Sequence, residues 1–316
     1  MAYKSTSAVV TKLSLVILVL LLCACGKEPS GYDLAMDAYR AGNYEVALEK
    51  LTPLAQAGDA RAQNLLGFMY EFGHAVDQDY GKAAKWYLKA AKQGVAASQS
   101  RLADFYIRGL GVPVDYWEAM KWSRKAAIQG NAEAEANIGY MYHDGFGVPQ
   151  DYKEAIKWYR RSAEKGWVGA MHDLGVMYQN GRGVEKDYAK AIEWYRKAAD
   201  REYPQSQSNL MNMYLDGLGL PKDEAKRLDW FLTAAKDKHV TEQYMLGIRY
   251  RRGMGVAKDK IKAYAWLGVA AAGGFEPAQQ LRTNLESSMD DEELEQARAL
   301  AREFWEKYGN KAKERG

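Results

Sequence analysis

Gly-x-Gly pairs recur along this chain, and a glycine-rich turn before a helix is one way in which proteins cradle a phosphate group. The segment GRGVEKDYAKAIEWYRKAA, residues 181–199, is one example. A phosphate loop follows a β-strand and continues as Gly-Lys-Ser or Gly-Lys-Thr. Here the residues before the turn have helical spacing, and no copy has that continuation. We therefore interpret the turn as a connection between two helices.

Histidine and cysteine are too sparse to predict a metal centre. No His-Glu-x-x-His motif or spaced cysteine pair occurs, so we expect neither a metal nor another cofactor. His143 and His172 are expected to face one groove from adjacent repeats, as surface residues. The full set is His74, His143, His172 and His239, with Cys23 and Cys25.

Catalytic signatures are absent as well. There is no Gly-x-Ser-x-Gly motif, and both cysteines lie close to the N-terminus, which leaves no thiol nucleophile elsewhere. We expect a protein that is not an enzyme. A glycan hydrolase would need two carboxylates facing a cleft, and the sequence spacing identifies no such pair.

The composition is that of a soluble globular protein. The chain has 316 residues, of which 47% are hydrophobic, and 44 basic and 41 acidic residues leave a net charge of +3. A general nucleic-acid binder has a clear basic excess or patch. The balance therefore predicts no nucleic-acid partner.

The N-terminus has the features of a secretory signal. Lys4 and Lys12 precede the apolar run LSLVILVLLL, which is too short to cross a bilayer. The following LCAC resembles the lipobox of bacterial lipoproteins. That resemblance implies a signal peptide over residues 1–24, acyl chains such as palmitate on Cys25, and a lipidated tether over residues 25–31. The alternative is ordinary cleavage after Ala24, which leaves Cys25 free.

The resemblance to lipoproteins also implies a location. Residue 26 is glycine and not aspartate, which in that family favours transport to the outer membrane. We expect the protein to be anchored there and to face the periplasm, with exposure at the cell surface as the alternative.

Four residue types share one period of 36 residues. Each recurs six times without an insertion, which indicates a repeat array. The positions are Trp86, Trp122, Trp158, Trp194, Trp230 and Trp266, and Tyr70, Tyr106, Tyr142, Tyr178, Tyr214 and Tyr250. Gly73, Gly109, Gly145, Gly181, Gly217 and Gly253 follow the same spacing, as do Asp79, Asp115, Asp151, Asp187, Asp223 and Asp259.

Each period is predicted to be a helical hairpin. In residues 166–200 the apolar positions have helical spacing on both sides of the turn. Gly181 is expected to end the first helix in a left-handed conformation, and Asp187 to cap the second. Trp194 is expected to fill the space between helices. Neither helix can bury its apolar face alone, so stacked hairpins must form one continuous core.

The repeat pattern Leu-Gly-x-x-Tyr-x-x-Gly-x-Gly-Val-x-x-Asp-Tyr-x-x-Ala-x-x-Trp-Tyr-x-x-Ala-Ala resembles the Sel-one-like repeat family, which is related to tetratricopeptide repeats. Residues 139–163 and 175–199 fit it nearly position by position, and the resemblance extends over residues 31–307. It implies an all-α fold, a right-handed α-solenoid of antiparallel helix pairs with capping helices at both ends. It also implies a role in protein–protein interaction.

The expected boundaries follow from the period. Residues 32–58 form a tetratricopeptide-like capping hairpin, and residues 59–286 form six full repeats and a final first helix. Residues 287–309 form a capping helix that begins with a Ser288–Asp291 capping box, and residues 310–316 form a disordered tail.

Some positions depart from the pattern. Ala75 replaces the second turn glycine, and Glu202 and Lys238 stand where other copies have glycine. Ala103 and Met211 replace the glycine of the first helix, which predicts looser helix contacts. The segment 200–240 is therefore the least regular. The off-period residues Trp117 and Trp167 are expected to pack between repeats, with exposure to solvent as the alternative.

The first helices are expected to line a concave groove that binds a protein or peptide. Positions 61, 64, 68, 71 and 72 and their periodic equivalents differ among copies, whereas the packing positions repeat. The expected partner-binding residues are Arg61, Asn64, Phe68, Glu71, Phe72, Arg108, Tyr140, His143, Asp144, His172, Gln179, Asn180, Asn212, Asp216, Tyr244, Arg251 and Arg252.

The sequence thus predicts a non-catalytic, membrane-anchored scaffold or adaptor in the bacterial periplasm. The alternative is an immunity protein, because some Sel-one-like lipoproteins neutralise phospholipase toxins secreted by neighbouring cells. The identity of the partner is not encoded in any motif.

Overall fold

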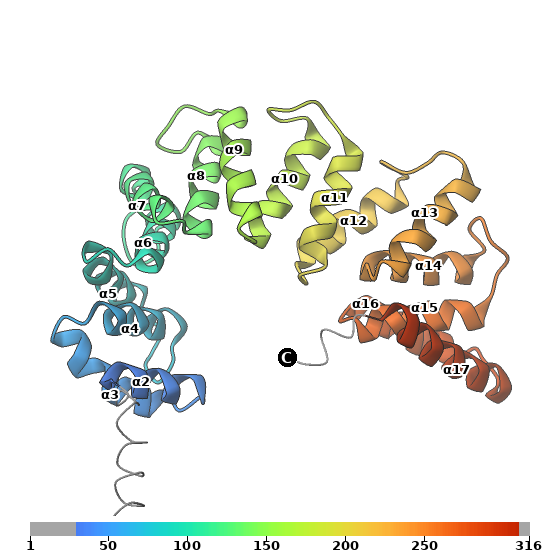
Figure 1. The fold of residues 1–316 in the computed structure, drawn as a ribbon, viewed down its shortest axis with the longest axis horizontal. Coiled ribbons are helices and arrows are strands. Elements are labelled where there is room, and N and C mark those ends of the chain that lie inside the picture. The colour runs from blue at the N-terminus through green and yellow to red at the C-terminus, as the bar shows by residue number, and fades with distance from the viewer. Residues whose placement is uncertain (1–29, 310–316) are drawn as a thin grey trace, which may run out of the picture. The chain divides into compact units, whose positions relative to one another are not determined.

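A computed structural model describes residues 30–309 as α-helices joined by turns, with no strand in that range. The chain forms two compact units, which meet in sequence at Val114 and Asp115. The first unit contains helices α2–α6, coloured blue to teal in Figure 1, and the second contains α7–α17, coloured green to red. The predicted all-α repeat fold is confirmed. The predicted signal peptide, Cys25 and the tail 310–316 lie outside the described residues.

The helices of the first unit are α2 (Gly31–Arg40), α3 (Tyr44–Gln56), α4 (Ala60–Phe72), α5 (Tyr80–Lys92) and α6 (Ala96–Arg108). Those of the second unit are α7 (Tyr116–Ile128), α8 (Ala132–Asp144), α9 (Tyr152–Glu164), α10 (Val168–Asn180), α11 (Tyr188–Ala199), α12 (Pro204–Leu215), α13 (Glu224–Lys236), α14 (Val240–Arg252), α15 (Lys260–Ala272), α16 (Glu276–Glu286) and α17 (Asp291–Tyr308).

The periodic aspartates begin the second helix of every repeat, as expected. Asp187, for example, accepts a hydrogen bond from the backbone N–H of Lys190 at 3.0 Å. Its own N–H donates to the carbonyl of Tyr178, which closes the turn. The side chain supplies an acceptor for a helix N–H that has no partner within the helix.

The two glycines of each Gly-x-Gly turn have different tasks. Gly181 ends α10 with φ +71°, in the left-handed region that glycine occupies most easily. Gly183, also left-handed, touches the start of the preceding repeat's second helix, because a Cβ there would lie 2.6 Å from the backbone carbon of Tyr152. The first glycine therefore ends a helix, and the second allows one repeat to rest on the previous one.

Close helix packing depends on a tyrosine that follows the periodic tryptophan. Tyr195 is fully buried and lies against Gly175 of the first helix, whereas Trp194 keeps partial exposure. The same pairing joins Tyr159 to Gly139. Trp194 does pack against the hydrophobic clusters on both sides, but only at their edge, and its neighbour Tyr195 takes the innermost position.

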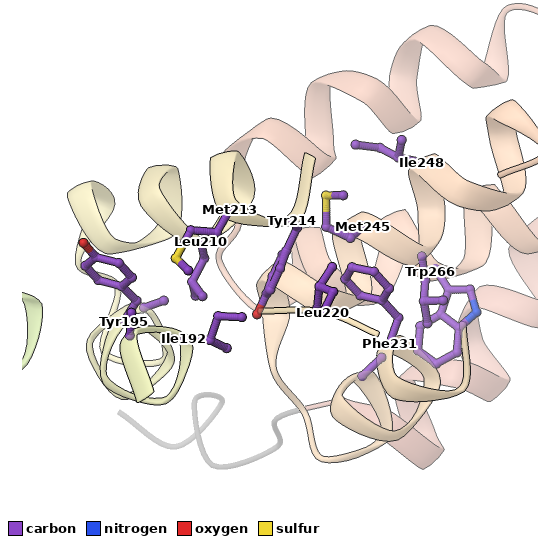
Figure 2. Close-up of a cluster of buried hydrophobic side chains, with 14 of the residues drawn as sticks. Ile192, Tyr195, Leu210, Met213, Tyr214, Leu220, Phe231, Met245, Ile248 and Trp266 are labelled. Carbon is purple, nitrogen blue, oxygen red and sulfur yellow. The ribbon is translucent and has the colours of Figure 1, made fainter. Parts of the chain in front are cut away.

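The fifth repeat is irregular, as its sequence predicts. Met211 stands where Gly175 stands one repeat earlier, and the backbones of α12 and α13 make few close approaches. The two helices instead meet through aromatic side chains, with the rings of Tyr214 and Phe231 5.2 Å apart (Figure 2). Looser helix contact at Met211 is confirmed. The corresponding expectation at Ala103 concerns α6 and α7, which belong to different units, and it stays a prediction.

A buried ionic network crosses this repeat. Glu242 on α14 accepts hydrogen bonds from Arg196 on α11 at 2.6 Å and from the hydroxyl of Tyr214 at 2.5 Å. The guanidinium of Arg196 also lies over the ring of Trp230. These contacts join α11, α12, α13 and α14, and they hold the irregular repeat between regular neighbours.

Both ends of the array differ slightly from the expected boundaries. Helix α2 begins at Gly31, capped by Ser30, so the predicted tether ends one residue too late. At the other end, Asp290 and Glu293 form the capping box of α17. The predicted Ser288–Asp291 box is wrong, because the Ser288 hydroxyl donates to the carbonyl of Leu285 in the preceding turn.

Candidate partner-binding surfaces

Most of the predicted partner-binding residues reach solvent on first helices or directly after them. Phe72 and Tyr140 are exposed large hydrophobic residues, with exposed fractions of 46% and 39%. Asn64, Phe68, His143, His172, Gln179 and Tyr244 are half-buried. The exposed members are Arg61, Phe72, Arg108, Tyr140, Asp144, Asn180, Asn212, Asp216, Arg251 and Arg252.

Glu71 does not belong to this surface. It is buried, and its carboxylate accepts hydrogen bonds from the hydroxyl of Tyr87 at 2.6 Å and from Arg101 at 2.7 Å. The prediction places Glu71 in the groove because its periodic position varies. Its structural role is to link α4, α5 and α6 inside the first unit.

His143 and His172 have separate partners and not a shared site. His143 pairs with Asp144 at 2.5 Å and lies 3.1 Å from a guanidinium nitrogen of Arg182. His172 pairs with the hydroxyl of Ser206 at 2.9 Å, and burial lowers the pKa of its imidazole. The two histidines, which were expected to face one groove, therefore make no direct contact with each other among these interactions. Within residues 30–309, no three His, Cys, Asp or Glu side chains are grouped to hold a metal ion.

Five aromatic rings gather on the first unit. His74 stacks on Tyr44 with ring centroids 4.4 Å apart, and its Nδ1 is 2.7 Å from the Tyr39 hydroxyl. Phe68 and Phe72 extend this group, also with centroids 4.4 Å apart. We call Tyr39, Tyr44, Phe68, Phe72 and His74 the aromatic cluster. It holds Phe72 in place while leaving much of that ring exposed, as is typical of an anchor for a partner.

A second surface, on the second unit, contains a carboxylate that the sequence prediction missed. Asp173 on α10 lies among groups from α8, α9 and α11. Enclosure by protein and the negative charge of Asp144 raise the pKa of Asp173 to about 7. The prediction used the first repeat as its template, where the equivalent position is Leu65. The missed signal is that this position is polar in four copies: Arg101, Asn137, Asp173 and Asn209.

Two tryptophans are more exposed than predicted. Trp117 at the start of α7 has an exposed fraction of 69%, and Trp167 before α10 has 39%. The expectation that both tryptophans pack between repeats is wrong for Trp117. Trp167 is covered in part and keeps part of its ring in solvent. Ile128, also on α7, is 87% exposed.

The described residues contain no helix that is both long and apolar enough to cross a membrane. The fold and its surfaces define a class of protein: a helical-repeat scaffold suited to protein–protein interaction, with internal positions that repeat and surface positions that vary.

The chain belongs to the Sel1 repeat family. The family's sequence profile matches six consecutive segments, residues 60–95, 96–131, 132–167, 168–203, 204–239 and 243–275. Proteins of this family are generally non-catalytic scaffolds. None of the curated proteins matches the chain.

Several solved structures are similar. A Sel1 repeat protein from Oxalobacter formigenes is 36% identical, with a TM-score of 0.56, over 76% of this chain and 96% of its own. The protective antigen c5321 of uropathogenic Escherichia coli is 29% identical, with a TM-score of 0.48, over 91% of this chain and 70% of its own. The immunity protein Pa5087 from Pseudomonas aeruginosa is 19% identical, with a TM-score of 0.44, over 63% and 80%.

Proposed function

We propose that this protein is a non-catalytic scaffold of the bacterial envelope that binds a protein or peptide partner through the exposed faces of its first helices. One observation carries the proposal. Packing positions such as Gly139 and Gly175 are the same in successive repeats, whereas the exposed positions of the same helices differ. A surface built from non-repeating side chains on a rigid frame can discriminate among partners.

The aromatic cluster supports the proposal in the first unit. Aromatic and arginine side chains dominate the binding energy of protein interfaces. Phe72 is exposed, has aromatic support behind it, and has the Arg101 guanidinium 5.9 Å from its ring centroid. Because its neighbours already restrict its position, little conformational entropy is lost when a partner covers it.

The proposed location depends on the N-terminal sequence. Acyl chains on Cys25 would hold the scaffold at the outer membrane, on the periplasmic side, with the segment up to Ser30 as a short tether. The alternative function, immunity against a secreted phospholipase toxin, uses the same exposed faces. It differs by requiring one very tight partner.

Affinity purification after crosslinking, from solubilised envelopes, tests the binding faces. The test bait carries Phe72→Ala, Tyr140→Ala and Arg252→Glu. The matched control carries Trp117→Ala and Ile128→Ala, which remove exposed apolar side chains from a second helix.

We expect the partner to be lost with the test bait and kept with the control. Envelope proteins lost in this way support the scaffold, whereas a secreted phospholipase recovered in near-equal amount supports immunity. Equal recovery with wild type, test and control baits would overturn the assignment of the first-helix faces.

A further inference from the structure

Arg282 stands at a position that the rest of the array uses for its core. It lies on α16, which begins 36 residues after α14, as the period requires. The equivalent residue of the six preceding first helices is leucine or isoleucine, and each is at most 2% exposed. These residues are Leu66, Leu102, Ile138, Leu174, Leu210 and Leu246. A cation at such a position costs folding free energy unless an anion pairs with it.

The last described helix leaves space beside Arg282. In a regular hairpin the second helix packs on the first helix that precedes it, as α11 does on α10. Helix α17 packs along α15 instead, and its backbone makes few close approaches to α16 (Figure 1). A cavity of about 360 Å³ remains, lined by residues of α15, α16 and α17. The displaced last helix therefore accounts for an opening at this end of the second unit.

The side chain of Arg282 lines this cavity without an anion. A Cβ on Gly268 would lie 3.7 Å from its Nη1, and its guanidinium carbon is 5.6 Å from the ring centroid of Tyr264. Its Nε is enclosed by protein and has no hydrogen-bond partner. Glu286, also on α16, accepts a hydrogen bond from the Tyr264 hydroxyl at 2.7 Å and pairs with Arg298 at 3.6 Å. Among residues 30–309, Arg282 thus forms no hydrogen bond or ion pair.

Two further guanidiniums line the same cavity. Arg298 and Arg302 both come from α17, one turn apart. Arg302 also forms no hydrogen bond or ion pair within the described part of the chain. Glu306 is the only carboxylate among the described residues of the lining. The cavity is therefore left with an excess of positive charge, which favours an anionic ligand.

The remaining lining is mostly apolar. Gly268, Ala272 and Ala301 are small residues, and Trp305 adds an aromatic ring. A free inorganic anion has no apolar part to cover this surface. A carboxylate carried by an amino acid brings methylene groups or a side chain along with its charge, so it matches both parts of the lining.

We propose that Arg282, Arg298 and Arg302 bind one carboxylate of the protein partner, from an acidic side chain or from the end of its chain. A planar guanidinium donates two parallel hydrogen bonds to a carboxylate, which makes arginine suited to this recognition. The partner thereby supplies the anion that Arg282 lacks. The inference rests on the proposed function and specifies the chemistry of one contact with the partner.

Acetylated peptides with the full chain test the ligand. One peptide is Gly-Gly-Leu with a free C-terminal carboxylate, and a second is Gly-Glu-Leu with an amidated end. Amidated Gly-Gly-Leu and Gly-Gln-Leu are the uncharged counterparts. Arginine labelled with nitrogen-15 reports binding by NMR, through the Nε–H signal that is lost in Arg282→Leu.

We expect a carboxylate peptide to shift the Arg282 signal and the uncharged peptides to leave it unchanged. Tighter binding of the first peptide identifies a chain end as the source of the carboxylate, and tighter binding of the second identifies an acidic side chain. Equal shifts with charged and uncharged peptides would overturn the proposal. So would inorganic phosphate that binds more tightly than both carboxylate peptides.

Arg282→Leu is the test variant, because it introduces the residue that most of the preceding first helices have at this position. Arg124→Leu, at an exposed residue on α7, removes the same charge elsewhere. We expect Arg282→Leu to weaken binding of the carboxylate peptide about tenfold by calorimetry, and Arg124→Leu to change it less than about twofold. Without peptide, Arg282→Leu should raise the Tm, since an unpaired cation is removed from a core position. Equal affinities of the two variants, or a lower Tm of Arg282→Leu, would refute the site.

Failure here is distinguishable from failure of the proposed function. A partner that is recovered equally by wild type and Arg282→Leu, but lost with the Phe72, Tyr140 and Arg252 variant, leaves the scaffold standing and refutes the carboxylate site. Peptide binding that depends on Arg282 supports the site even where the purification recovers no partner.

Discussion

The ring of Tyr195 lies so close to Gly175 that a Cβ on that glycine would be 2.5 Å from two ring carbons. Real Cβ contacts are never that short, so any side chain at residue 175 must push α10 and α11 apart. This contact brings the two helices of the hairpin close together, and the same contact recurs between Gly139 and Tyr159.

Gly175→Ala is therefore expected to lower the free energy of unfolding by about 1 to 3 kcal/mol, because the core of the hairpin becomes overpacked. Urea denaturation followed by circular dichroism measures the change. Gly169→Ala is the control in the same helix, since its Cβ would meet only the movable side chain of Trp167. It should be neutral or slightly stabilising, as alanine favours the helix. A similar loss in both variants would contradict the packing argument.

Lys238 has φ +71°, a left-handed conformation that costs a residue with a Cβ free energy. Lys238→Gly is expected to raise the free energy of unfolding by about 0.5 to 1 kcal/mol. The neighbouring Asp237 has φ −78°, so Asp237→Gly should lower it instead. Thermal unfolding of both variants decides the matter, and a loss of stability in Lys238→Gly would refute the expectation.

Glu242→Gln tests the ionic network of the irregular repeat. Glu242 is fully buried, and removing its charge leaves the Arg196 guanidinium enclosed without an anion. We expect a loss of about 3 to 5 kcal/mol in unfolding free energy. Glu154→Gln breaks an exposed pair with Lys157 and should cost less than about 1 kcal/mol. Comparable losses in the two variants would show that the network contributes no more than a surface pair.

Asp173 should make stability fall as pH rises. Because its folded-state pKa is about 7, above the usual value for aspartate, the protonated form is favoured in the folded protein. The destabilisation appears as pH increases from about 4 toward 7. Asp173→Asn is expected to stabilise the protein by about 1 to 2 kcal/mol at about pH 8 and by nearly nothing at about pH 4, after allowance for partial solvent access. Denaturation at the two pH values measures this, and a pH-independent difference would contradict the cause assigned here.

Cys25→Ala tests the anchor. If Cys25 carries the acyl chains, the variant is released from membranes in fractionated cells and no longer incorporates labelled palmitate. Cys23→Ala removes the other cysteine, which would leave with the signal peptide, and should stay membrane-bound. Membrane retention of both variants would refute lipidation at Cys25.

The repeat period made the fold predictable from the sequence. Asp187 begins a helix and Gly181 ends one through backbone interactions that depend on the residue type alone. Their roles can therefore be predicted without knowing which other residues lie nearby. Where two neighbouring side chains suit one position, the sequence does not decide between them. Trp194 and Tyr195 are both aromatic, and only their rotation about the helix selects Tyr195 for the interior.

The candidate site was less predictable, because surface roles depend on neighbours from other repeats. Glu71 varies among copies as a binding residue would, yet it is buried by its contacts with Tyr87 and Arg101. Asp173 was not among the expected binding positions, because those positions were chosen on the first repeat, where Leu65 occupies the equivalent place. At the last helix the prediction chose Ser288 as the cap, whereas Asp290, two residues later, has the extended backbone and caps α17.

The second glycine of each turn also bears on how such a chain can change length. Gly147 rests on Tyr116, and Gly183 rests in the same way on Tyr152, one repeat later. A deletion in the gene that removes a block such as residues 132–167 would bring Gly183 onto Tyr116. The lost contact between Gly147 and Tyr116 would then be replaced by an equivalent contact. Unequal recombination between repeats of 36 residues can therefore lengthen or shorten the array without a new interface having to evolve.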